Sequence, residues 1–270
     1  MSDGRHGAVA SRSASHSGNE LRRLLTHKAT LPALLAGACV CASAAAAAGE
    51  PGATPIDAVT WQVADAAQLH LFVDDGHGQP VRSLRRAASV VAASGHRLVF
   101  AMNAGIYEPT LAPTGLAIEA GRELAPLEVR DGTGNFYASP NGVFYVTAAG
   151  AAIARTTAFA TAAPKGVRLA TQSGPILLED GAMPAAVVRA PSGPSARRLK
   201  RNAVCVSHGT ATLVMVDTGV TLHELALYLR DHVGCRDALY LDGAISQLLD
   251  ERSGRNDEGV ALGAILGVVE

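Results

Sequence analysis

An aspartate and a serine follow directly after a short apolar run near the end of the chain. Ala238 to Leu241 predicts a buried strand, and Asp242-Gly243-Ala244-Ile245-Ser246 ends it. Burying a carboxylate is costly unless something pairs with it or uses it, so an acid at the end of a buried strand favours a functional site. Asp-Gly is also ordinary turn chemistry, and these residues alone leave both interpretations open.

A second aspartate, Asp217, is predicted at the end of the apolar strand Thr212 to Val216. Thr221 and Glu224 have capping-box spacing and predict that a helix begins there. If the strands on either side of this helix are neighbours, the unit places Asp217 and Asp242 side by side along one edge of the sheet.

The elements that must position these residues are short strands and a few helices. Val59 to Val63, Gln68 to Val73 and Arg97 to Met102 predict strands, the last of which stops at Asn103-Ala104-Gly105. Pro80 to Ser94 carries an apolar stripe at helical spacing, which we interpret as core packing. Turn residues predict hairpins around 119–122, 148–150 and 207–210. Residues 57–270 therefore read as one domain.

Residues 1–50 are predicted to be an export signal and linker. Arg22, Arg23 and Lys28 precede an uncharged run, Leu31 to Ala48, that ends in small residues typical of a cleavage site. The run is short and rich in alanine, so we favour a cleaved signal over a retained membrane anchor. The mature protein is then expected in the periplasm or outside the cell, with no stable membrane insertion.

Composition excludes nucleic acid as a partner. The 270 residues are 48% hydrophobic and carry a formal net charge of -1, which is enough apolar material for a core but no basic surface for phosphates of DNA or RNA. The densest basic stretch, Arg197 to Arg201, is short.

Two cysteines remain if the signal is removed. Cys205 and Cys235 form an even pair in an oxidising compartment, which allows a disulfide. We favour two buried thiols instead, because Cys205 lies inside a strand-like apolar run. No pair of His residues is four apart and no C-x-x-C occurs, so a zinc site is not predicted.

Five short motifs resemble, in order, those of the phosphodiester glycosidase family. They are Asn103-Ala104-Gly105-Ile106-Tyr107, Gln172-Ser173-Gly174-Pro175-Ile176-Leu177, Arg201-Asn202-Ala203-Val204, Asp217 with its capped helix, and Leu241-Asp242-Gly243. The resemblance implies an α+β fold: a single domain with a central mixed, largely antiparallel sheet flanked by helices. It also implies that the motif loops converge on one cleft.

The sequence departs from the family pattern at several positions. Ala244 and Ile245 interrupt the glycine-rich segment after the aspartate, Cys205 stands where glycine is common, and Tyr107 replaces an aromatic pair. The chain is closer to the exported bacterial branch. Substrate specificity therefore does not transfer from the resemblance.

The implied chemistry is hydrolysis of a sugar-1-phosphodiester at the glycosidic C–O bond. The phosphate monoester is a good leaving group and needs little help from a general acid. The active site must therefore supply a base or nucleophile and a group that binds the phosphate. Asp242 is the first candidate for base or nucleophile. Asp217, Glu108 and Asp131 are candidate partners.

Arg201 is the candidate phosphate clamp, because a guanidinium can bind two phosphate oxygens; a plain surface arginine is the alternative. Asn103 is either a ligand donor or a turn cap, and Ser173 either contacts ligand or begins a tight turn. We read Ser246 as a hydrogen-bonding residue because no His lies at a useful spacing. The motifs add further candidate substrate-binding residues: Gly105, Gly174, Asn202 and Gly243.

Two other function classes stay open. The same polar cleft would serve a non-catalytic protein that binds a carbohydrate or phosphoglycan. The hypothesis of a serine hydrolase has less support, because no G-x-S-x-G motif occurs in the sequence. No cofactor is predicted. Carboxylates near a bound phosphate could hold a divalent cation, so that alternative stays open. The expected partner is a small-molecule or glycan phosphodiester.

Overall fold

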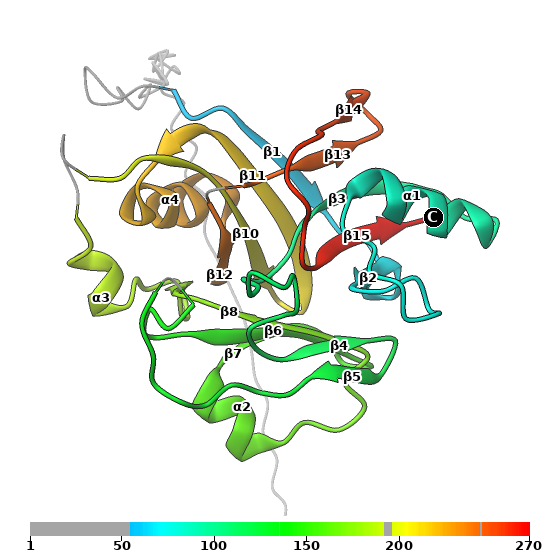
Figure 1. The fold of residues 1–270 in the computed structure, drawn as a ribbon. Helices are drawn as coiled ribbons and strands as arrows, with labels where there is room; N and C mark the ends of the chain where they lie inside the picture. Colours follow the sequence, from blue (N-terminus) through cyan, green and yellow to red (C-terminus); the bar gives the residue numbers. More distant parts are fainter. Residues whose placement is uncertain (1–54, 135, 192–195, 244) are drawn as a thin grey trace, which may run out of the picture. The chain divides into compact units, whose positions relative to one another are not determined.

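The strands of this protein are short and alternate in side-chain direction, and together they build three sheets around one core (Figure 1). The computed structural model describes residues 55–134, 136–191, 196–243 and 245–270. The predicted export signal at residues 1–50 lies outside them.

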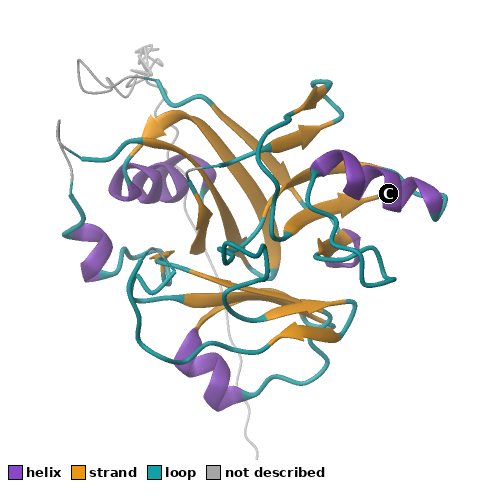
Figure 2. Ribbon diagram, in the orientation of Figure 1, coloured by secondary structure: helices purple, strands orange, loops and turns teal. Residues whose placement is uncertain are grey.

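Each sheet has five strands, and all pairings between the described strands are antiparallel (Figure 2). Sheet 1 has the order β1 (Ala58–Gln62), β11 (Thr210–Val220), β10 (Leu199–Ser207), β12 (Asp237–Asp242) and β9 (Ile176–Leu178). Sheet 2 has the order β14 (Arg255–Asn256), β13 (Leu248–Asp250), β3 (Leu98–Asn103), β15 (Ile265–Val269) and β2 (Leu69–Phe72). Sheet 3 has the order β5 (Arg122–Ala125), β4 (Ala117–Glu119), β8 (Leu169–Ser173), β6 (Gly142–Thr147) and β7 (Gly150–Arg155).

The helices are few and short. They are α1 (Leu84–Ala93), α2 (Thr156–Ala162), α3 (Ala185–Val188), α4 (Leu222–Tyr228), the 3-10 turn η1 (Ala66–Gln68) and the π-helical turn η2 (Leu229–Val233). No helix in the described part of the chain is long and apolar enough to cross a membrane.

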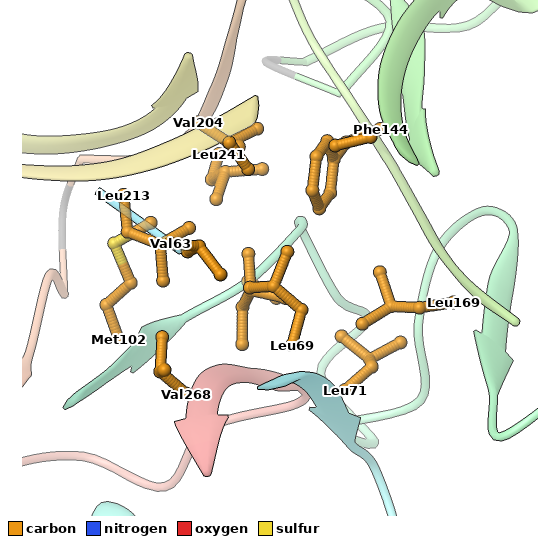
Figure 3. Packing of buried hydrophobic residues seen from close by; sticks show 14 of the residues in the cluster. Val63, Leu69, Leu71, Met102, Phe144, Leu169, Val204, Leu213, Leu241 and Val268 are labelled. Atoms are coloured by element: carbon orange, nitrogen blue, oxygen red, sulfur yellow. The ribbon is translucent and has the colours of Figure 1, made fainter. Parts of the chain in front are cut away.

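The central core takes side chains from all three sheets (Figure 3). Val204 and Leu241 come from sheet 1, Met102 from sheet 2, and Phe144 and Leu169 from sheet 3. Burying each such side chain stabilises the fold by roughly 1.5–3 kcal/mol. This shared core is what holds the ends of strands from different sheets close together.

Strand alternation sends the other side chains to the outer faces, where short helices cover them. On β10, Val204 faces the central core while Ala203 and Cys205 face the cluster built with α4. α1 packs in the same way against sheet 2, and Phe159 of α2 against sheet 3.

The prediction of one central mixed sheet is wrong, because the strands form three sheets. The largely antiparallel pairing, the single domain and the mixture of strands and helices are found. Hairpins are set by local turn residues, and those predicted around 119–122, 148–150 and 207–210 are present. Which hairpins share a sheet depends on contacts distant in sequence, for which a local pattern carries no signal.

The predicted capping box is confirmed at the start of α4. The Thr221 hydroxyl oxygen accepts the Glu224 N–H at 3.1 Å, and the Glu224 carboxylate accepts the Thr221 N–H at 2.8 Å. The helical segment ends at Gly234, which has a φ of 77°, a conformation that glycine adopts without steric cost.

Cys205 and Cys235 form a disulfide, so the interpretation as two free thiols is wrong. Their Cα atoms lie 5.4 Å apart, within the usual range for the bond. The apolar surroundings of Cys205 indicated burial correctly, but burial does not distinguish a thiol from a disulfide.

Glu119, the last residue of β4, carries a buried carboxylate oxygen. Within the described residues, Oε2 of Glu119 has no hydrogen-bond partner. The Asp74 carboxylate lies nearby and is paired with Arg122 at 2.9 Å. Burial, and secondly the charge of Asp74, raises the pKa of Glu119 to about 7.

We expect Glu119→Gln to stabilise the protein at pH 8 but not at pH 4. The raised pKa means that stability is lost as the pH rises from the unfolded value of 4.5 through about 7, because the folded state keeps the proton longer. The full effect would be roughly 3 kcal/mol, and solvent screening of this partly exposed group reduces it to about 1–2 kcal/mol. Urea unfolding at both pH values measures it. An equal gain at both pH values would contradict the ionisation argument.

Candidate functional site

Asp242 is the last residue of β12, and both of its carboxylate oxygens accept hydrogen bonds. Oδ2 accepts from Asn103 Nδ2 at 3.0 Å, and Oδ1 accepts from the Gly243 N–H at 2.6 Å. The side chain is half-buried. Its orientation is therefore fixed by a side chain from another sheet and by its own turn.

Two asparagines connect the strands that meet at this point. Asn202 Nδ2 donates to the carbonyl oxygen of Asn103 at 2.5 Å, and Asn202 Oδ1 accepts the Asp242 N–H at 2.9 Å. Asn103 Oδ1 accepts the N–H of Gln247 at 3.0 Å. These bonds link β3, β10 and β12, and satisfy two amides that are almost completely buried.

Sheet 3 reaches the same point through β8. The Ser173 hydroxyl donates to the carbonyl oxygen of Leu241 at 3.0 Å and is fully buried, so it supports the strand that carries Asp242. Gly105 packs directly on β8, since a Cβ on it would lie 2.4 Å from the carbonyl oxygen of Gln172. The ends of strands from all three sheets therefore converge near Asp242.

Arg201 is buried rather than lying on the surface, with 6% of its area exposed. Its Nε donates to the carbonyl oxygen of Val220 at 2.7 Å, and Nη1 donates to the hydroxyl of Tyr240 at 3.0 Å. Nη2 donates to the carbonyl oxygen of Arg197 at 3.2 Å. Each terminal nitrogen of a guanidinium carries two N–H groups, so these bonds fix the plane and leave donor capacity.

Arg201 and Tyr240 line a cleft of about 180 Å³. Arg197 joins them there, and apolar walls come from Pro175 and Leu222. The remaining lining residues are Ala138, Ala190, Pro191, Leu199 and Thr221.

Gly243 packs against two residues that line this cleft. A Cβ on Gly243 would lie 2.4 Å from the Tyr240 hydroxyl and 3.1 Å from Arg201 Nη1. Burial, opposed by Arg201 and assisted by the charge of Asp242, raises the pKa of Tyr240 to about 12. The phenol therefore stays protonated, and can donate one hydrogen bond while accepting another.

Asp217 does not lie beside Asp242. It is inside β11 rather than at its end, and β10 separates β11 from β12, so the two strands of the predicted unit are not neighbours. Arg255 holds its carboxylate at 2.5 and 2.9 Å, and Lys200 Nζ lies at 3.0 Å. These cations, Arg255 first, lower the pKa of Asp217, which indicates a structural ion pair.

The other candidates differ in burial. Glu108 and Asp131 lie on exposed loops. Ser246 is half-buried, and its hydroxyl donates to the carbonyl oxygen of Asp242 at 3.5 Å. Gly174 packs against Asn141, to which a Cβ would approach within 2.8 Å.

Sequence reasoning overlooked three side chains. Tyr240 stands two residues before Asp242 on the same strand, and this i, i+2 spacing is the signal that could have identified it. Arg197 lies four residues before Arg201. Tyr107, named only as a departure from the family pattern, donates to the Ala261 carbonyl oxygen at 3.0 Å, and burial followed by the charge of Asp242 raises its pKa.

A protein-built metal centre is not evident at this site. Within the described ranges, no group of three or more His, Cys, Asp or Glu side chains is arranged to hold a metal ion.

We expect Gly243→Ala to lower the unfolding free energy by about 1–3 kcal/mol, because the added methyl group must displace Tyr240 and Arg201. Gly219→Ala is the matched control, since its nearest heavy atom would be 3.5 Å away, an ordinary contact. Urea denaturation compares the two. Equal urea midpoints for the two variants would show that Tyr240 and Arg201 move aside without loss of stability.

A family model and a curated relative match this chain. The family model described as phosphodiester glycosidase matches residues 96–263. The Escherichia coli (strain K12) protein named "Uncharacterized protein YigE" is 32% identical over 183 residues, which cover 67% of this chain and 69% of that protein.

A solved structure shares the fold. It is the catalytic domain of zebrafish N-acetylglucosamine-1-phosphodiester alpha-N-acetylglucosaminidase, auto-inhibited by its pro-peptide, with a TM-score of 0.54 and 13% identity over 81% of this chain and 84% of that chain. The family match spans more than half of the 270 residues and includes Asn103, Arg201 and Asp242. The chain therefore belongs to the phosphodiester glycosidase family.

Proposed function

We propose that this protein is an exported hydrolase of sugar-1-phosphodiesters that cuts the glycosidic C–O bond. The observation that carries the proposal is the Asp242 carboxylate, oriented by Asn103 and followed by Gly243, which packs against the cleft residues Arg201 and Tyr240. Membership of the family supports the same chemistry.

In the proposed reaction, water attacks the anomeric carbon and gives a proton to Asp242. The bond between that carbon and the phosphate oxygen breaks, its electron pair stays on the oxygen, and a free sugar and a phosphate monoester leave. Asp242 acting first as a nucleophile is the second route, with water then hydrolysing the glycosyl-enzyme bond. In both routes Asn103 positions the carboxylate.

The remaining charged groups divide into two roles. Arg201, with Arg197 at the mouth of the cleft, binds the phosphate of the substrate. Asp217 serves the fold by pairing with Arg255 and Lys200, because its lowered pKa keeps it ionised and unsuited to donate a proton. Glu108, on the loop after β3, is the remaining candidate for a second carboxylate.

Export is proposed from two observations. Residues 1–50 have the composition of a cleavable signal. The Cys205–Cys235 disulfide fits an oxidising compartment outside the cytosol.

Hydrolysis of a panel of alpha-linked sugar-1-phosphodiesters in ¹⁸O-labelled water tests the proposal. We expect free sugar with the label at the anomeric hydroxyl and an unlabelled phosphate monoester. Release of sugar-1-phosphate, with the label in phosphate or in the alcohol, would identify cleavage of a phosphoester bond instead. Tight binding of a diester without turnover would identify a carbohydrate- or phosphoglycan-binding protein.

A further inference from the structure

The cleft beside Asp242 combines positive charge with apolar walls. Arg197 and Arg201 supply the charge, while Pro175, Leu199 and Leu222 supply the walls. Leu199 begins β10 and Leu222 begins α4, so the walls stand on two elements of the fold and not on one loop. A ligand that fits must carry an anion joined to an apolar group.

The two hydroxyl oxygens that line this cleft already accept hydrogen bonds from within the protein. The Thr221 hydroxyl oxygen accepts from the Glu224 N–H at 3.1 Å, and the Tyr240 hydroxyl accepts from Arg201 at 3.0 Å. Among the described residues, the lining contains no carboxylate and no side-chain amide. A sugar has several hydroxyls that need such partners, and burying them unpaired is costly.

The volume of the cleft is compatible with such a ligand. A volume of about 180 Å³ corresponds to roughly six times the share of one water molecule in the liquid. That space admits a phosphate with a short alkyl chain or one small ring. Gly243 packs against Tyr240 and Arg201, which line the cleft, so a phosphate bound by Arg201 would have Asp242 on one side and the apolar walls on the other.

We propose that this cleft receives the phosphate and the leaving alcohol of the diester, and that this alcohol is apolar, an alkyl or aryl alcohol, rather than a second sugar. The proposal rests on the proposed function for the direction of cleavage. The sugar then lies on the side of the half-buried Asp242 carboxylate.

Two diesters with the same sugar and phosphate test the proposal. One carries n-butanol as the leaving alcohol and the other carries a hexose through its primary hydroxyl. We expect kcat/KM to be at least about tenfold higher for the butyl diester, since each buried methylene favours binding by roughly a factor of four. An equal or higher value for the hexose diester would overturn the proposal.

Two variants test whether the preference for the butyl diester arises at the apolar wall of the cleft. Leu222→Ala is expected to remove most of the preference for butyl, and Val260→Ala, at an exposed valine outside the cleft lining, is expected to leave it unchanged. A preference that persists in Leu222→Ala, in a variant whose circular dichroism matches the parent protein, would contradict the assignment of this wall.

A binding measurement separates this proposal from the proposed function. Calorimetry with butyl phosphate and glycerol 3-phosphate needs no turnover, and we expect butyl phosphate to bind the parent protein at least about tenfold more tightly. If neither diester is cleaved, the proposed function fails, and this comparison alone decides what the cleft accepts. Equal affinity for both monoesters would overturn the apolar assignment.

Discussion

Asp242→Asn is expected to lower kcat on a sugar-1-phosphodiester by roughly 10²–10⁴-fold while changing the binding of substrate only a few-fold. The amide cannot take a proton from water or attack the anomeric carbon, and these steps account for a loss of that size. It keeps the volume of the carboxylate and one oxygen that can accept from Asn103. Steady-state hydrolysis and calorimetry with uncleaved diester measure the two effects.

Asp237→Asn is the matched control because Asp237 lies at the other end of the same strand, β12, where its carboxylate accepts the N–H of Asp180 at 3.0 Å. It should retain full activity. If Asp242→Asn also retained activity, the carboxylate would be structural and the base would have to come from another residue, with Glu108 the first to replace.

Removing the disulfide should cost roughly 3–4 kcal/mol of unfolding free energy. The bond joins residues 30 apart in sequence, and the chain-entropy estimate for closing a loop of that length gives this value. Alanine at both Cys205 and Cys235 preserves their apolar surroundings, since both side chains are almost fully buried. Urea denaturation of the double variant and of the parent protein provides the comparison.

The parent protein in strong reductant is the second arm of this test. It should lose about the same stability as the double variant and regain it on reoxidation. Intact mass before and after reduction should differ by two hydrogens. An unchanged mass together with an unchanged urea midpoint would show that the thiols are free in solution.

The sequence indicated the site best where a polar residue follows an apolar strand. Asn103 and Asp242 were identified in this way, and both lie where buried strands of different sheets end. The reason is local: an uncompensated amide or carboxylate at such a point is costly, so its presence demands a partner. Asn103 and Asp242 are each other's partners but lie 139 residues apart in sequence, so a local pattern could not predict their pairing.

Asp217 shows where local reasoning fails. The turn-like Asp217-Thr218-Gly219 suggested the end of a strand, but β11 continues to Val220, where it still pairs with Leu199 of β10 after a shift in register. Its cation Arg255 lies 38 residues further on. Strand neighbours and ion pairs of this kind are fixed by tertiary packing, which also decided that the domain has three sheets.

The amide links among Asn103, Asn202 and Asp242 have a consequence for thermal inactivation. Because they tie together strand ends that belong to separate sheets, any partial opening that parts sheet 2 from sheet 1 also disconnects Asp242 from the group that orients it. Loss of function on heating should therefore coincide with the earliest separation of the sheets and precede complete melting of the strands.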